Sequence, residues 1–164
     1  MHKSGGFTLV ELFIALAVAA VLLTLAAPAF LDTLARARLD SASSGLVGAV
    51  NLARSEAVKR ARLATLCSRS ENDDGDPVCG DDEDWADGWI VFADGVADAV
   101  RVGDPMGDIT VDTEVEEVTF EATGRRTGGA GDLTFCLAGR ADTVRSIAVA
   151  PLGRVATEVL EECP

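Results

Sequence analysis

Residues 6–12 read Gly6-Phe7-Thr8-Leu9-Val10-Glu11-Leu12 and lead directly into a long apolar run. From residue 12 to residue 31 the chain has 20 residues without a charge, and all but Thr24 and Pro28 are apolar. As a helix this run is about 30 Å long, which is the thickness of the apolar core of a bilayer. The stretch therefore predicts one N-terminal helix whose first half spans a membrane.

The apolar run has two other possible interpretations. A buried core helix is disfavoured, because a small domain does not enclose so many consecutive apolar residues. A cleaved secretory signal is an alternative, since Ala27-Pro28-Ala29 resembles a small-x-small cleavage site. However, Glu11 is unusual at the head of such a signal, and the run continues to Leu31. We therefore favour a retained membrane helix, and Lys3 places the short N-terminus on the cytoplasmic side.

Charge is segregated along the chain, which explains how a net charge of −13 coexists with a mean hydropathy of +0.23. Residues 1–62 have a net charge of +3, residues 63–121 of −16, residues 122–157 of +3, and residues 158–164 of −3. The acidic balance disfavours a general nucleic-acid binder, because phosphates repel such a surface.

The helix is predicted to continue to about residue 62. Apolar residues recur there at steps of three and four, which is typical of a helix with one buried face. These residues are Leu39, Ala42, Leu46, Ala49, Ala53 and Ala57.

After residue 62 the pattern changes to short β-type runs separated by Gly, Asp and Pro. The predicted strands are Leu63–Cys67, Trp89–Phe92, Ala99–Val102, Ile109–Val111, Val115–Phe120, Leu133–Leu137, Ser146–Val149 and Arg154–Val159. The fold class predicted is α+β, with a long N-terminal helix packed on a small antiparallel β head of two layers.

Four cysteines allow three pairings. We favour Cys67–Cys79, which closes an acidic loop, and Cys136–Cys163, which ties the tail to a strand. By chain-entropy estimates each gives about 3 kcal/mol. There is no C-x-x-C pattern and His2 is the one histidine, so no zinc site is predicted.

The N-terminal stretch resembles the class III leader of type IV pilins and type II secretion pseudopilins. The resemblance rests on Gly6, Phe7, Glu11 and the apolar run that follows. It implies that a prepilin peptidase of the inner membrane cuts between Gly6 and Phe7 and methylates the new amino terminus of Phe7. It also implies that Glu11 neutralises the amino terminus of a neighbouring subunit in a filament. A carboxylate at bilayer depth is costly, which supports a functional role. The alternative is a Glu11 that reaches the head groups without a partner.

Further stretches resemble the GspH/FimT subfamily of minor pseudopilins and minor pilins. They are residues 51–60, Trp85 with residues 88–94, Phe120 with Gly124-Arg125, and residues 151–155. The resemblance implies a structural subunit that primes assembly near the tip of a secretion pseudopilus or type IV pilus. It implies other pilins as partners, anchorage in the inner membrane and a periplasmic or surface-exposed head.

Some FimT-type pilins bind DNA for uptake through a Gly-Arg-x-Arg element, and DNA binding is the alternative function. The corresponding residues here are Gly153-Arg154-Val155-Ala156, so the second arginine is missing. Residues 122–157, whose net charge is +3, are called the basic block, and they hold five arginines that could bind phosphates. The alternative is that these arginines are simply solvated. They are Arg125, Arg126, Arg140, Arg145 and Arg154.

Nine acids lie between Glu71 and Asp87. Their spacing is not that of an EF-hand, so a solvated loop is favoured over a calcium site, and no metal or cofactor is predicted. No nucleophile elbow, P-loop or H-E-x-x-H pattern is present, and no enzymatic activity is predicted.

The expected segments are a cleaved leader (1–6), a transmembrane half-helix (7–31), an amphipathic half-helix (32–62) and a β-rich head (63–164).

Overall fold

The computed structural model describes residues 8–80, 84–128, 131–139 and 144–163, apart from the side chains of residues 23 and 25–28. The chain divides into two compact units, residues 1–34 and residues 35–164. The second unit is called the head below. Every strand and every buried core residue that the structure describes lies in it.

The N-terminal element is the helix α1, Leu9–Arg60, which confirms the predicted long helix. Thr8 caps its start, because the Thr8 hydroxyl accepts a hydrogen bond from the Glu11 amide at 3.2 Å while the Thr8 amide donates to Glu11 Oε2 at 3.3 Å. This reciprocal pair is a capping box, and its sequence signature is Thr-x-x-Glu.

The helix ends in a Schellman turn. The Arg62 amide donates to the Ala57 carbonyl at 3.1 Å, and the Ala61 amide donates to Val58 at 3.3 Å. Ala61 takes the left-handed conformation, with φ of 53°, that glycine usually supplies at this position.

In the first unit, the apolar side chains that can be described are largely exposed, as at Phe13 (64 %) and Phe30 (67 %). Among the described residues, no helix combines the length and the apolar character that crossing a membrane requires.

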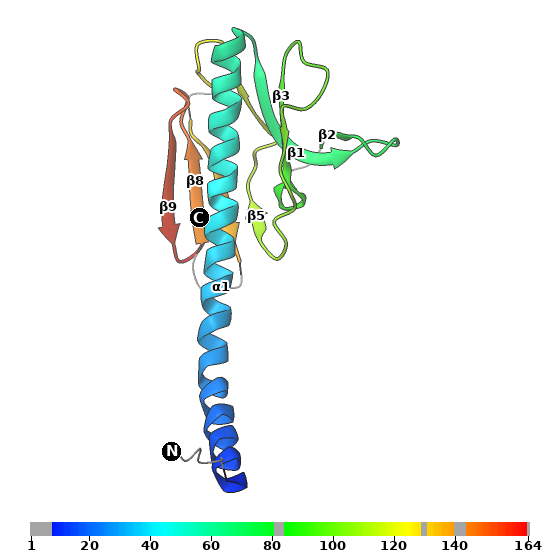
Figure 1. Ribbon diagram of the computed structural model, residues 1–164. Helices are drawn as coiled ribbons and strands as arrows, with labels where there is room; N and C mark the ends of the chain where they lie inside the picture. Colours follow the sequence, from blue (N-terminus) through cyan, green and yellow to red (C-terminus); the bar gives the residue numbers. More distant parts are fainter. Residues whose placement is uncertain (1–7, 81–83, 129–130, 140–143, 164) are drawn as a thin grey trace, which may run out of the picture. The chain divides into compact units, whose positions relative to one another are not determined.

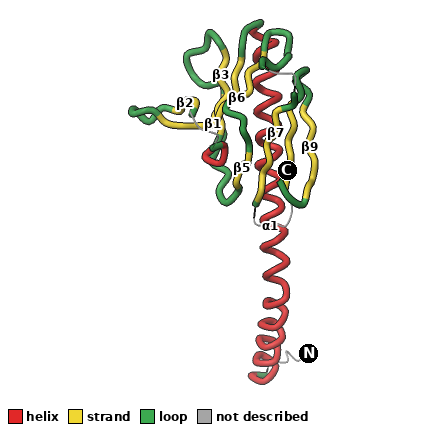
Figure 2. The backbone as a smooth tube through the Cα atoms, turned by 180° about the vertical axis from the view of Figure 1, so that it is seen from behind, coloured by secondary structure: helices red, strands yellow, loops and turns green. Residues whose placement is uncertain are grey.

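The strands form two antiparallel sheets (Figures 1 and 2). The first contains β1 (Ala64–Glu71), β2 (Pro77–Cys79), β3 (Trp89–Ala93), β4 (Arg101–Val102) and β6 (Glu117–Phe120). Strand β1 is its centre and pairs with β2, β3 and β6. A single 3-10 turn, η1 (Trp85–Asp87), precedes β3.

The second sheet has the order β5-β7-β8-β9, with β5 at Thr110–Asp112, β7 at Leu133–Ala138, β8 at Val144–Val149 and β9 at Val155–Leu160. All eight predicted strands are therefore present, with shifted ends. The strand that was not predicted is β2, whose sequence Pro-Val-Cys lies in the acidic loop.

The core lies between the second half of α1 and the sheets. The predicted helix face is confirmed, since five of its six residues are at most 1 % exposed: Leu39, Leu46, Ala49, Ala53 and Ala57. Trp85 is fully buried, donates its indole N–H to the Val115 carbonyl at 2.7 Å, and meets the Phe135 ring edge-on at 4.8 Å. This bond satisfies the polar atom of the largest core side chain.

Candidate functional site

The predicted cleavage site at Gly6 and Phe7 lies outside the described residues. Glu11, the predicted assembly residue, lies in the first turn of α1 and is exposed. Its Oε2 accepts from both the amide and the hydroxyl of Thr8, each at 3.3 Å. These are long contacts from neutral donors, and a positively charged donor binds a carboxylate more strongly.

The four described arginines of the basic block do not form one patch. Arg145, on β8, binds Asp40 of α1 through Nε at 2.8 Å and Nη2 at 2.5 Å, and its side chain is 19 % exposed. A second ion pair, Arg38–Asp108 at 3.6 Å, joins the same part of the helix to the loop before β5. Arg145 therefore holds the helix against the second sheet.

Arg126 is also structural. It is 6 % exposed, and its guanidinium donates to the carbonyl of Thr127 at 3.1 Å and to that of Gly131. Arg140 lies outside the described residues. Arg125 and Arg154 are exposed, so they are the two described arginines of the predicted set that face solvent.

Arg125 and Arg154 each follow a buried glycine in a tight turn. Gly124 and Gly153 both have φ of +76°, which a residue with a Cβ adopts only with strain. A Cβ on Gly153 would lie 2.6 Å from the Gly124 carbonyl oxygen, so the two turns touch through their backbones. The Arg126 amide adds a hydrogen bond to the Pro151 carbonyl at 3.0 Å.

Arg54 of α1 completes this arrangement. Its Nε donates to the Gly124 carbonyl at 2.9 Å, and a Cβ on Gly153 would approach the same Nε to 2.8 Å. We call Arg54, Gly124, Arg125, Gly153 and Arg154 the Gly–Arg junction. Arg54 was not among the predicted site residues, although its position next to Ala53, on the predicted buried face, was a signal that its side chain could reach the sheets.

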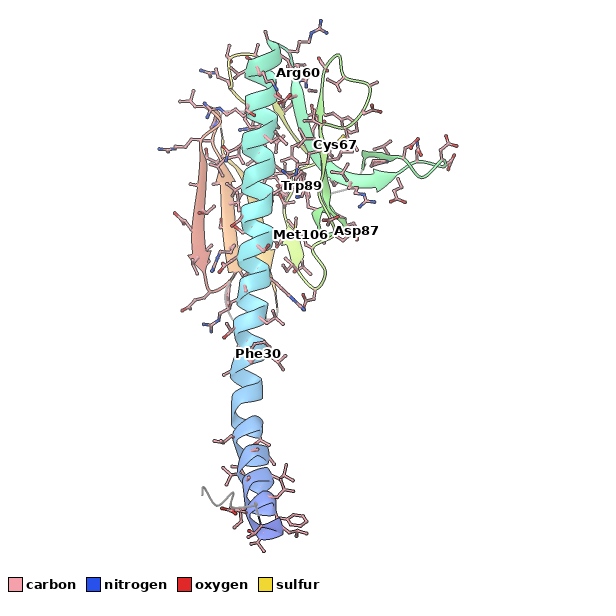
Figure 3. The ribbon with its side chains drawn as sticks, viewed as in Figure 1. Phe30, Arg60, Cys67, Asp87, Trp89 and Met106 are labelled. Atoms are coloured by element: carbon pink, nitrogen blue, oxygen red, sulfur yellow. A yellow bond between two sulfur atoms is a disulfide. The ribbon has the colours of Figure 1, made fainter. Side chains whose placement is uncertain are left out.

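The last turn of α1 carries two more cations, Lys59 and Arg60, and Arg60 marks the end of the helix in Figure 3. Glu56 is 7 % exposed and pairs with Arg60 at 2.6 Å and with Lys59 at 3.3 Å. The hydrogen bond from Arg60, followed by that from Lys59, lowers the pKa of the Glu56 carboxyl below its usual range.

Both favoured disulfides are formed. Cys67–Cys79 joins β1 to β2 with a Cα–Cα distance of 5.5 Å, and Cys136–Cys163 joins β7 to the tail after β9 at 5.8 Å. The first closes the base of the acidic β1–β2 hairpin.

Within residues 8–80, 84–128, 131–139 and 144–163, no three His, Cys, Asp or Glu side chains are grouped so as to hold a metal ion.

Two family models match the chain. Residues 42–153 match the type II transport protein GspH, and residues 1–27 match the prokaryotic N-terminal methylation motif. A comparison with curated protein sequences found no match.

Among solved structures, the chain is similar to the type IV minor pilin FimU of Pseudomonas aeruginosa PAO1 in two crystal forms. One match has 26 % identity and a TM-score of 0.59, and covers 75 % of this chain and 90 % of FimU. The other has 27 % identity and a TM-score of 0.57, and covers 73 % and 92 %. The similarity therefore extends over nearly all of the FimU structures.

The GspH match covers most of the chain, and the methylation motif covers the N-terminal stretch that contains Gly6, Phe7 and Glu11. The α+β fold is that of a minor pilin. The chain belongs to the GspH family, and it is a type IV pilin-like protein, a minor pilin or pseudopilin.

Proposed function

We propose that this protein is a priming subunit near the tip of a type II secretion pseudopilus or a type IV pilus. The observation that carries the proposal is the pairing of an N-terminal methylation motif with a GspH-type head in one chain. The similarity to FimU, a minor pilin, supports a minor rather than a major subunit. In this role the chain performs no catalysis.

The proposed route begins in the inner membrane. Residues 7–31 insert as a single span, the peptidase cuts between Gly6 and Phe7, and Phe7 is methylated. The support for these steps is the leader sequence and its match to the methylation motif. The head, with its two disulfides, lies on the periplasmic side, where such bonds form and persist.

Glu11 is proposed to direct incorporation into the filament. A methylated amino terminus of a neighbouring subunit is a charged donor, so it competes well against the long contacts that Glu11 makes with Thr8. Pairing these two charges at bilayer depth sets the register of one subunit against the next.

The experiment compares Glu11→Val with the wild type in the native host. Cleavage of the leader should be unchanged, because the site lies before Glu11, while the amount of the chain in sheared filaments should fall. Gly6→Val is the complementary variant and should retain the leader, which mass spectrometry of the membrane-extracted protein detects. Normal incorporation of Glu11→Val would refute the role given to this carboxylate.

DNA binding during uptake is the second candidate, and the observation that favours it is the Gly–Arg junction. The junction places Arg125 and Arg154 on adjoining turns, which suits the oxygens of a phosphate backbone. Against it, Arg126 and Arg145 are engaged within the head. A head comprising residues 37–164 that retards no DNA at low salt would end this candidate. If DNA is retarded, Arg154→Ala should weaken the shift.

A further inference from the structure

Three arginines of the head come together at the Gly–Arg junction. The turn of Gly124 lies against Val58 and Arg54 of the helix, because a Cβ on Gly124 would be 3.1 Å from Val58 Cγ2 and 3.2 Å from Arg54 Nε. The junction therefore includes the side of α1 that carries Arg54 and Val58. Its cations are Arg54, Arg125 and Arg154, and the exposed Glu121 belongs to the same turn as Gly124, whose amide donates to the Glu121 carbonyl at 2.8 Å.

Two of these three cations have no partner within the described residues, whereas Arg54 donates to the Gly124 carbonyl. Within the described part of the chain, neither the guanidinium of Arg125 nor that of Arg154 has a hydrogen bond or an ion pair. Both follow turns whose backbones are fixed against each other, so little backbone freedom is lost when they bind a ligand.

The small number of free cations favours a compact anionic partner over DNA. Tight binding to a duplex needs several phosphate contacts along a stripe, and the salt dependence of affinity grows with their number. Within the described residues, the junction offers two arginines without a partner, on a head that carries nearly all of a −13 net charge. Guanidinium groups bind carboxylates in a bidentate manner, so two of them match a pair of acidic side chains.

The head of this chain itself carries an exposed acidic surface of the kind that two arginines could bind. The β1–β2 hairpin projects from the first sheet (Figure 1) and carries Glu71, Asp73, Asp74 and Asp76, all exposed. A filament is built from heterologous contacts, in which one surface of a subunit meets a different surface of the next. The Gly–Arg junction on one subunit and an acidic surface on its neighbour satisfy this requirement.

We propose that the Gly–Arg junction is a docking site for a carboxylate-bearing surface of a neighbouring filament subunit, with Arg125 and Arg154 as its ligands and Arg54 as the residue that positions both turns. This inference rests on the proposed function.

The test uses the full-length chain, co-expressed with the other pilin-like subunits encoded in its own genome and extracted in detergent. The double variant Arg125→Glu/Arg154→Glu should lower co-purification of one of these subunits by about tenfold or more, because like charges facing each other oppose association. Arg101→Glu, an exposed arginine on β4, makes the same change of charge elsewhere and should leave co-purification unchanged. Substituting lysine for the facing carboxylates of that subunit should restore binding to the double variant.

Three results would overturn the proposal. The first is unchanged co-purification of a double variant that unfolds at the wild-type temperature. The second is a wild-type chain that co-purifies with none of these subunits. The third is a double variant that keeps its subunit partners but no longer retains a short DNA duplex, which would assign the junction to DNA. The proposed function has its own test, because it would be refuted if the wild-type chain were absent from sheared filaments.

Discussion

Arg54 of the helix donates a hydrogen bond to the carbonyl oxygen of Gly124, 70 residues away in sequence, at 2.9 Å. This single bond links α1 to the turn after β6, and the turn of Gly153 packs on top of both groups. Three segments distant in sequence therefore meet at one point. Arg125 and Arg154, which follow the two glycines, are exposed to solvent beside it.

Gly153→Ala should destabilise the head by about 2–4 kcal/mol. The left-handed conformation alone costs a residue with a Cβ about 1–2 kcal/mol. The new Cβ would also press on the Gly124 carbonyl at 2.6 Å, which is backbone and cannot move aside freely. Urea unfolding of residues 35–164 measures the loss. Gly75→Ala is the matched control, because Gly75 has φ of +82° but open space around it, and it should lose only the conformational part.

The Asp40–Arg145 pair should contribute more to stability than the Arg38–Asp108 pair. Arg145 approaches Asp40 with two nitrogens at 2.5 and 2.8 Å and is mostly covered, whereas Arg38 is 57 % exposed and 3.6 Å from Asp108. Double-mutant cycles to alanine should give a coupling of about 1 kcal/mol for the first pair and about half of that or less for the second. Equal couplings would contradict the assignment of Arg145 as the anchor of the helix.

Glu56 should make part of the head's stability depend on pH. The hydrogen bonds from Arg60 and Lys59 lower its pKa in the folded state. A lowered folded pKa stabilises the fold above the unfolded pKa, about 4.3 for glutamate. This contribution disappears as the pH falls through the folded pKa. The gap in unfolding free energy between wild type and Glu56→Gln should therefore be widest near pH 7 and close in acid. A gap that is constant with pH would show that the ion pairs do not act in solution.

The two disulfides should differ modestly in their effect on stability. The chain-entropy model gives about 3 kcal/mol for Cys67–Cys79, which closes 12 residues, and about 3.5 kcal/mol for Cys136–Cys163, which closes 27. Replacing each pair with alanine and measuring urea unfolding of the head tests the order. If the shorter loop proved the more stabilising, packing of the acidic hairpin rather than chain entropy would be the dominant effect.

The sequence predicted the helix and most strands because their patterns are local. The apolar steps from Leu39 to Ala57 and the alternation within strands such as β7 need no knowledge of distant residues. Strand β2 was not predicted because Pro77 and the surrounding acidic residues favour a loop. It pairs with the last three residues of β1, Arg69, Ser70 and Glu71.

The candidate site was predicted less well, because it depends on long-range contacts. The sequence grouped five arginines by their position in a basic block. The fold instead uses Arg126 and Arg145 inside the head and adds Arg54 from the helix. An arginine's partners are set by which segments the fold brings together, and neither charge pattern nor spacing reveals them. The sequence shows that residues 124 and 153 are glycines, but it does not show that their two turns are in contact.

The most direct test of the account is mass spectrometry of the chain in sheared filaments or pseudopili of its native host. The account predicts that the chain is present, begins at Phe7, and carries one methyl group on its amino terminus. A chain that is absent from the filament fraction while its membrane form is correctly processed, or that occurs there with residues 1–6 still attached, would contradict it.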